Sequence, residues 1–214
     1  MVEVEIWSDF ACPFCYIGKR NFEIALSKLD SRLQVNVVYR SFELDPNREK
    51  TASVSVYELL AKKYGKTVEW AHEMNKNVVA TGAAAGLTFN MDLVKPVNTF
   101  DAHRLAHFSS GKKMKLDIHD RLFAAYFTNG ENIADRAVLG KIALEAGLDV
   151  KEVEVLLDSN DEADEVRSDE DRAQQIGVQG VPFFVFDGTV GVSGAQPPEV
   201  FLEVFSELGL EARS

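Results

Sequence analysis

The sequence predicts an α/β fold in which strands lie near the two ends of the chain and a long run of helices separates them. Two observations support this prediction. Apolar residues form short strand-like patterns near residue 4 and again near residue 185. Between residues 48 and 171, helix-capping residues and helix-ending glycines recur with little strand signal.

The N-terminal part of the chain predicts a strand, a helix and a second strand. Val2, Val4 and Ile6 alternate with glutamates, which is typical of a strand that ends before Asp9. A helix is expected from Pro13, because proline suits the first helical position. Residues 33–44 predict the second strand, and its apolar centre favours a strand covered on both faces. A helical crossover makes the two strands parallel.

Capping signals divide the middle of the chain into helices. Ser55 and Glu58 form a capping box, in which each side chain bonds the other residue's backbone N–H. This helix is expected to end at Gly65. Further helices are expected to begin at Thr67, Asn98 and Asp135, and helix ends are expected at Gly86, Gly111, Gly130 and Gly147. Charged helical sequence continues to Gly177, and we interpret the acidic stretch 158–171 as a solvent-exposed helix face.

Strand signals return near the C-terminus. Residues 181–186 and 189–192 flank Asp187-Gly188, which predicts a hairpin, and a last helix follows near Pro197. Without the helical middle, the order is strand, helix, strand, hairpin and helix, which is the order of a thioredoxin fold. We therefore predict a thioredoxin fold interrupted by a large all-helical insertion. The thioredoxin-like domain would comprise residues 1–47 and 172–214, and the helical insertion domain residues 48–171.

The two cysteines of the 214-residue chain, Cys12 and Cys15, flank Pro13 and Phe14 at the start of the first helix. Residues at positions i and i+3 of a helical turn are close enough for a disulfide. The N-terminal turn of a helix has unpaired N–H groups and a partial positive charge, which favours the nucleophilic thiolate. Cys12 is therefore expected to attack a substrate, and Cys15 to resolve the product.

Three other interpretations of Cys12 and Cys15 compete with redox chemistry. They could be two core residues, a permanent structural disulfide, or half of a zinc site. A structural disulfide is typical of exported proteins, and a structural zinc site needs four ligands, whereas the chain has no second cysteine pair. His103 and His107 lie four residues apart but lack an evident third ligand, so we expect no metal site.

Charge and composition exclude several classes of partner. The net charge of −11 disfavours nucleic acid and anionic membranes. No apolar run is long enough to span a membrane. The acidic N-terminus enters a strand at once and lacks the pattern of a signal peptide, so we expect a cytoplasmic protein. In that compartment a Cys-x-x-Cys pair is more often catalytic than structural.

Four segments resemble DsbA-like proteins of the FrnE type, a family related to 2-hydroxychromene-2-carboxylate isomerases and kappa-class glutathione transferases. Residues 8–18 resemble the family's active-site segment, and residues 177–185 resemble its cis-proline segment. Residues 98–105 and 193–197 are similar to its inserted-domain and C-terminal segments. The resemblance implies a thioredoxin domain interrupted by a helical one, thiol–disulfide exchange, and a cis-proline at Pro182. Beside it, the backbone of Val181 would pair with an extended substrate.

Several further residues are candidates for a cleft beside the cysteines. Asp9 could transfer protons or cap the local backbone. His103 could line the substrate cleft or pack as a satisfied core histidine. Phe10 and Phe14 could contact substrate or pack inward, and Asn98 belongs to the inserted-domain segment of the resemblance.

The leading functional hypothesis is a thiol–disulfide oxidoreductase that oxidises, reduces or isomerises disulfides through Cys12 and Cys15. Its cofactor would be the Cys12–Cys15 disulfide, with glutathione as a candidate co-substrate and protein or small-molecule thiols and disulfides as partners. A glutathione-dependent isomerase or transferase is the first alternative, although those branches carry serine at the position of Cys12. A non-enzymatic module that binds peptide or a small molecule is the second. The sequence leaves the direction of catalysis open, and a dimer is one option for the oligomeric state.

Overall fold

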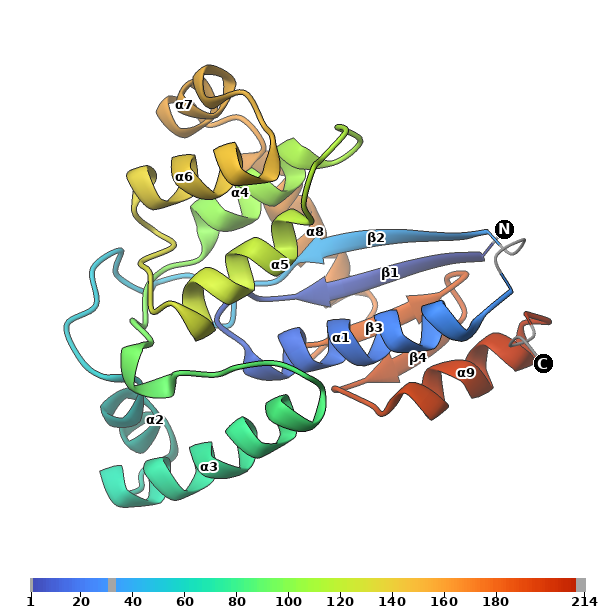
Figure 1. The fold of residues 1–214 in the computed structure, drawn as a ribbon, viewed down its shortest axis with the longest axis horizontal. Coiled ribbons are helices and arrows are strands. Elements are labelled where there is room, and N and C mark those ends of the chain that lie inside the picture. The colour runs from blue at the N-terminus through green and yellow to red at the C-terminus, as the bar shows by residue number, and fades with distance from the viewer. Residues whose placement is uncertain (1, 31–33, 211–214) are drawn as a thin grey trace.

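The computed structural model describes residues 2–30 and 34–210, which contain a four-stranded mixed sheet. Its order is β2-β1-β3-β4. The strands are β1 Val2–Ser8, β2 Val35–Ser41, β3 Phe183–Phe186 and β4 Val190–Ser193. β1 and β2 are parallel, as predicted, and β3 is antiparallel to β1 and β4. With the helices arranged around this sheet (Figure 1), the predicted α/β thioredoxin-like class is confirmed.

Helices make up most of the remaining structure. Their bounds are α1 Pro13–Lys28, α2 Val56–Tyr64, α3 Val68–Ala84, α4 Phe100–Ser109, α5 Ile118–Phe123, α6 Arg136–Ala146, α7 Val150–Asp158, α8 Ala163–Gln175 and α9 Pro198–Glu207. A short 3-10 helix, η1, covers Met91–Leu93, and α5 continues into a π-helix, η2, at Ala124–Thr128. No helix in the described part of the chain has the length and apolar character needed to cross a membrane.

The predicted capping residues position several of these helices. Ser55 and Glu58 form both bonds of the capping box, and Gly65 ends α2 in the left-handed conformation. The helix expected from Asn98 begins two residues later, at Phe100. The Asn98 side chain accepts a hydrogen bond from the Phe100 N–H at 2.9 Å, so it satisfies one of the free donors of this helix end.

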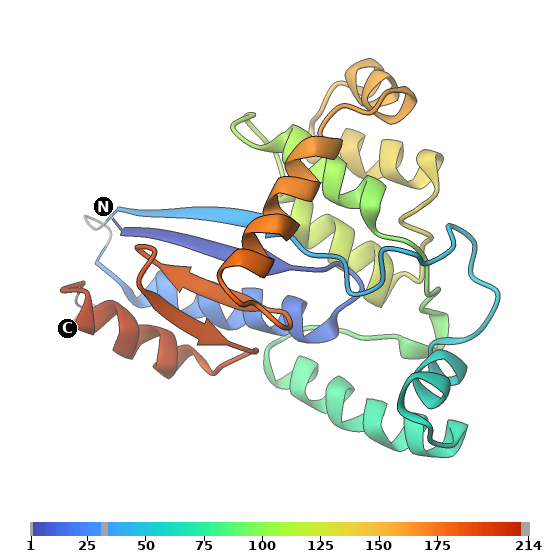
Figure 2. The same ribbon diagram turned by 180° about the vertical axis from the view of Figure 1, so that it is seen from behind.

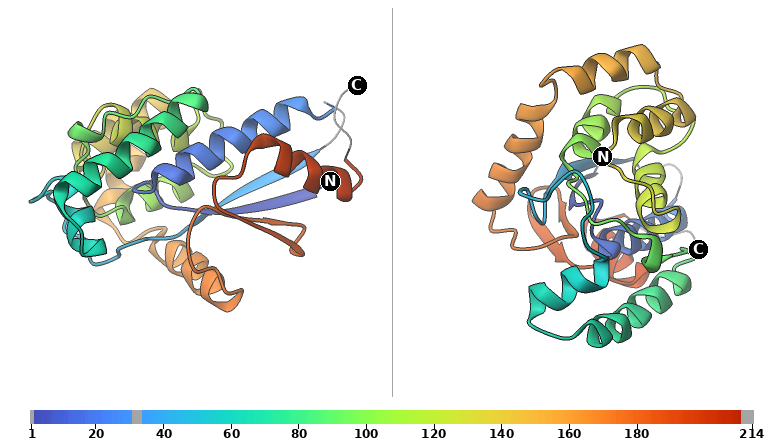
Figure 3. Two further views of the ribbon diagram at one scale, coloured as in Figure 1. Left: turned by 90° about the horizontal axis from the view of Figure 1, so that it is seen from below. Right: turned by 90° about the vertical axis from the view of Figure 1, so that its left-hand side faces the viewer.

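The sheet lies between two layers of helix. α1 and α9 cover one face, and α8 crosses the other face, as the views in Figures 2 and 3 show. Under α1 and α9, the buried core is rich in phenylalanine: Phe22, Phe184, Phe186, Phe201 and Phe205. On the other face, buried Trp7 packs with Ala173 of α8 and with Val178. Full burial of one such side chain contributes about 1.5–3 kcal/mol, so these contacts fix α1 against the sheet.

The second strand is shorter than predicted and most of its residues are only half-buried. The strand runs over Val35–Ser41 rather than residues 33–44, and Leu33 lies outside the described residues. β2 is an edge strand that pairs with β1. Its apolar side chains, Val35, Val37 and Tyr39, pack against the phenylalanine-rich core, and α8 contacts β2 as well.

The acidic stretch 158–171 is not simply a solvent-exposed face. It spans the end of α7 and most of α8, and Asp169 of α8 is buried. The Asp169 carboxylate accepts from the Ser41 N–H at 2.9 Å and from Arg40 at 3.0 Å. A carboxylate can be buried when hydrogen bonds replace its hydration. Asp169 therefore fixes α8 to the end of β2.

Arg104 of α4 joins this helix to the end of α7 and to the loop that follows it. Its buried guanidinium donates to the carbonyl oxygens of Leu156, Ser159 and Asp161, and it pairs with Asp101 at 2.9 Å. These bonds connect α4 to the end of α7 and to the loop before α8. The predicted domain boundary at residue 172 stays a prediction, and α8, which begins before it, packs on the sheet.

Candidate active site

Both cysteines lie at the N-terminus of α1 as free thiols. Cys12 occupies the N-cap position and Pro13 the first helical position, because proline needs no hydrogen-bond acceptor there. The Cys12 sulfur lies 3.6 Å from the carbonyl oxygen of Val181, and the Val181–Pro182 peptide bond is cis. The structure thus brings Cys12, Cys15, Val181 and Pro182 together from distant parts of the chain.

Cys15 lies one helical turn after Cys12 in α1 and is buried. Its sulfur accepts a hydrogen bond from the Asp9 N–H at 3.4 Å. Burial, followed by the neighbouring Cys12 thiol, raises the pKa of Cys15 well above its ordinary value. The Asp9 amide and the Ser8 hydroxyl oppose this increase in pKa but do not cancel it. A nearby proton acceptor would therefore favour the loss of the Cys15 proton.

Gly18 allows α1 to lie close to Pro182. A Cβ atom added at Gly18 would lie 2.9 Å from Pro182 Cγ and 3.4 Å from Phe184 Cζ. From the sequence, Gly18 is singled out only as part of the segment 8–18, which resembles the family's active-site segment. A glycine inside a helix was the available signal, since it costs about 1 kcal/mol relative to alanine unless space requires it.

Replacing Gly18 with alanine should destabilise the protein by about 1–3 kcal/mol, because the added methyl group must displace Pro182. Exchange activity should fall at the same time. The matched control is Gly140→Ala in α6, where an added Cβ meets nothing within 4 Å. This control should stabilise the protein by up to about 1 kcal/mol. Urea unfolding of both variants measures the difference, and equal midpoints would contradict the proposed close approach.

The Asp9 carboxylate caps the local backbone, which was one of its two predicted roles. One oxygen accepts from the Ala11 N–H at 3.1 Å, and the other from the Leu44 N–H at 2.7 Å. Its backbone carbonyl accepts from the Cys12 N–H at 3.0 Å. Asp9 therefore holds the loop that carries the cysteines against the segment that follows β2.

Phe10 and Phe14 differ in their surroundings. Phe14 is 45% exposed beside Cys12, so its ring is free to contact a substrate. Phe10 is buried, with its ring centroid 4.9 Å from that of His103 and 5.1 Å from that of Phe123. Phe10 thus packs the loop after β1 against α4 and α5.

His103 and Asn98 lie in different environments. His103 is buried beside Phe10, with its Nε2 atom 3.5 Å from Asp9 Oδ1. The Asn98 side chain donates to the carbonyl oxygen of Pro46 at 3.2 Å and lies 3.4 Å from Glu43. Asn98 therefore fixes the segment after β2.

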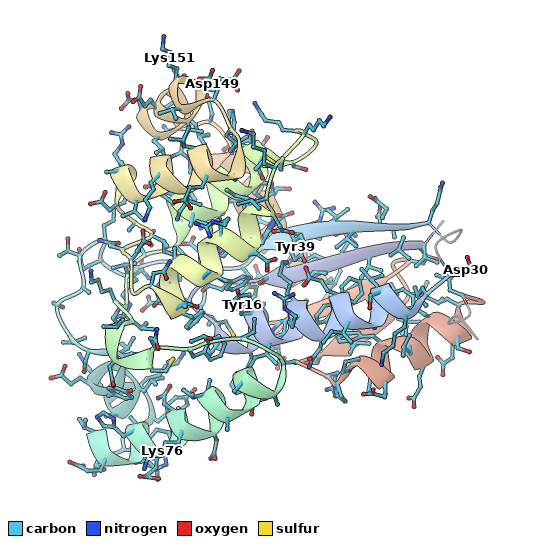
Figure 4. The ribbon with its side chains drawn as sticks, viewed as in Figure 1. Tyr16, Asp30, Tyr39, Lys76, Asp149 and Lys151 are labelled. Carbon is cyan, nitrogen blue, oxygen red and sulfur yellow. The ribbon has the colours of Figure 1, made fainter. Side chains whose placement is uncertain are left out.

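A cavity of about 620 Å³ lies between β2 and the helices α4 and α5. Phe10 and His103 form part of its wall, together with Tyr39, His107 and His119. Tyr39 stacks on His119 of α5 at a centroid distance of 4.0 Å, and Tyr16 stacks on Phe123 at 4.9 Å. Figure 4 shows Tyr39 where β2 meets α5, and Tyr16 near the start of α1. Neither cysteine lines this cavity.

Charged clusters near the cavity are satisfied by protein groups. Glu23, Asp117 and Asp120 lie close enough together to hold a cation, and the buried Lys19 ammonium contacts all three, at 2.5, 3.5 and 2.8 Å. His107 pairs with Asp169 at 2.9 Å, whereas His103 faces Asp9. The two histidines thus face different carboxylates.

Comparison with known proteins gives consistent matches. The model of the DSBA-like thioredoxin domain family matches residues 3–206. A probable DsbA oxidoreductase from Streptomyces coelicolor is 41% identical, with a TM-score of 0.91 over 100% of this chain and 93% of that one. The uncharacterised protein YwbO of Bacillus subtilis is 28% identical over 96% of both chains. The cytosolic disulfide reductase DsbM from Pseudomonas aeruginosa, solved with GSH, shares the fold at 13% identity, with a TM-score of 0.68 over 97% of this chain and 100% of that one.

Proposed function

Because the chain belongs to the DSBA-like thioredoxin domain family, we propose that it is a thiol–disulfide oxidoreductase of the FrnE type that exchanges disulfides through Cys12 and Cys15. One observation carries the proposal. Two free thiols lie at a helix N-terminus, and the outer one faces the carbonyl group that precedes Pro182. This arrangement offers a nucleophile, a second thiol and a backbone acceptor in one place.

The chemistry divides between the two thiols. The Cys12 thiolate attacks one sulfur of a substrate disulfide, and the bonding electrons leave with the other sulfur. This step forms a mixed disulfide between Cys12 and the substrate. Cys15 then loses its proton and attacks the Cys12 sulfur, which forms the Cys12–Cys15 disulfide and releases the second substrate sulfur as a thiol. The same steps in reverse oxidise a dithiol.

The substrate-facing residues would be Phe14, Val181 and Pro182. The exposed Phe14 ring supplies apolar surface beside Cys12, and the Val181 backbone would pair with an extended substrate segment. We propose protein or small-molecule thiols and disulfides as partners, with glutathione as co-substrate and a cytoplasmic location. The proposal needs no cofactor beyond the Cys12–Cys15 disulfide.

A redox titration of the full chain in glutathione buffers tests the proposed function. Thiol trapping and mass spectrometry should show one reversible two-electron transition of Cys12 and Cys15, between about −120 and −270 mV as in thioredoxin-fold catalysts. The midpoint will show whether the protein tends to oxidise or to reduce its substrates.

Two outcomes would contradict the proposed function. A lasting glutathione adduct on Cys12 alone would favour a glutathione-dependent isomerase or transferase. The absence of any disulfide at every buffer ratio would favour a binding module.

A further inference from the structure

His103 carries a buried imidazole that takes no part in the exchange steps described above. Its side chain is only 4% exposed, and its Nε2 atom has no hydrogen-bond partner among the described residues. This atom lies 3.5 Å from Asp9 Oδ1. A buried polar atom without a partner costs free energy, and a catalytic role is one reason for such an atom in a native protein.

The residue that His103 faces contacts both cysteines. The Asp9 N–H donates to the Cys15 sulfur at 3.4 Å, and its carbonyl oxygen accepts from the Cys12 N–H at 3.0 Å. Its carboxylate is fixed by two backbone N–H groups, those of Ala11 and Leu44. Asp9 is therefore held rigidly between the thiols on one side and the His103 imidazole on the other.

The exchange reaction requires a proton to leave Cys15. Burial, followed by the Cys12 thiol, raises the pKa of Cys15 well above its ordinary value, so Cys15 is protonated near neutral pH. Resolution of a mixed disulfide uses the thiolate of Cys15. A nearby group that accepts this proton would accelerate the second step of the exchange without affecting the first.

The surroundings of His103 suit a group that gains and loses a proton. Its ring lies on Phe10 and forms part of the wall of the 620 Å³ cavity, which gives the buried imidazole a route to solvent. Besides Asp9, two titratable groups interact with it, Glu43 and His119. Glu43 is paired with Arg167 at 2.6 Å. Burial lowers the pKa of His119, which favours its neutral form. Among the described residues, the Asp9 carboxylate is therefore the acid that faces His103 and has no cationic partner of its own.

We propose that His103, acting through Asp9, accepts the proton that Cys15 releases when it resolves the mixed disulfide. This inference rests on the proposed function. As Cys15 attacks the Cys12 sulfur, the Cys15 proton passes to the Asp9–His103 pair, and the substrate sulfur leaves with the electrons of the broken bond. The pair then returns the proton to that sulfur or to solvent, so the step needs no further reactant.

The test separates the two steps with 5,5′-dithiobis(2-nitrobenzoate), which releases one coloured thiolate when Cys12 attacks and a second when Cys15 resolves. Both phases are followed on the reduced full chain from about pH 5 to about pH 9. In the wild type, the second phase should rise with pH and then reach a plateau. In His103→Gln, it should be about 10- to 100-fold slower near neutral pH and should rise without a plateau. The first phase should change by less than about twofold.

Several results would overturn the inference. An unchanged pH profile in His103→Gln, or equal slowing of both phases, would assign His103 a merely structural role. Asp9→Asn provides a second variant if His103→Gln does not fold. The double variant should be no slower than Asp9→Asn alone, since the two residues act in one pathway, and additive losses would contradict this. A wild-type protein without any second phase would instead refute the proposed function.

Discussion

Replacing Cys12 with serine should reduce disulfide exchange by at least about 1,000-fold, to the uncatalysed rate. A serine hydroxyl is not ionised near neutral pH and cannot replace a thiolate that lies at the N-terminus of α1 and faces the Val181 carbonyl group. The exchange of a fluorescent glutathione disulfide measures the loss. Retained activity would refute the proposed mechanism.

Cys15→Ser is the matched control for this prediction, because it removes the second thiol and keeps the first. The variant should still attack the substrate at about the wild-type rate, but it should accumulate a mixed disulfide at Cys12, which mass spectrometry detects. Failure to trap this adduct would assign the roles of the two cysteines differently.

Arg104→Met should cause the largest loss of stability, about 3–5 kcal/mol. The substitution leaves buried Asp101 without its buried partner, and it leaves the carbonyl oxygens of Leu156, Ser159 and Asp161 without their common donor. A buried charge or carbonyl group without a hydrogen bond is more costly than the bond itself is favourable. Urea unfolding followed by circular dichroism measures the change in the free energy of unfolding.

Lys50→Met is the matched control for Arg104→Met. Lys50 also pairs with Asp101, at 2.6 Å, but its side chain is 64% exposed. Exposed ion pairs contribute little, so this variant should lose less than about 1 kcal/mol. Similar losses in the two variants would show that burial of Arg104 does not determine its contribution.

Local signals in the sequence predicted much of the fold and the reactive pair. The capping box at Ser55, the turn at Asp187-Gly188 and the cysteines beside Pro13 each act over a few residues, and the structure has the corresponding elements there. These features depend on backbone geometry close to the residue concerned, and periodicity and capping rules describe that geometry.

Contacts between distant segments could not be predicted in the same way. Asp169 lies in an acidic run that is typical of an exposed face, but the fold places it at the end of β2, where Ser41 and Arg40 satisfy its charge. The approach of His103 to Asp9 likewise depends on how α4 packs over the loop after β1. No short sequence pattern predicts such a contact, because the contact depends on how whole helices and strands are arranged.

The apolar cluster around the thiols has a consequence for protein engineering. Phe10, Cys12, Cys15 and Tyr16 belong to the same buried cluster as residues of α3, α4, α5, α6 and α7, rather than to the core under α1 and α9. Joining β2 directly to α8 would therefore remove the inner wall of the reactive centre and leave these side chains on an open apolar surface. The helical segment is thus not a detachable module, and a minimal redox catalyst cut from this chain would have to replace that wall.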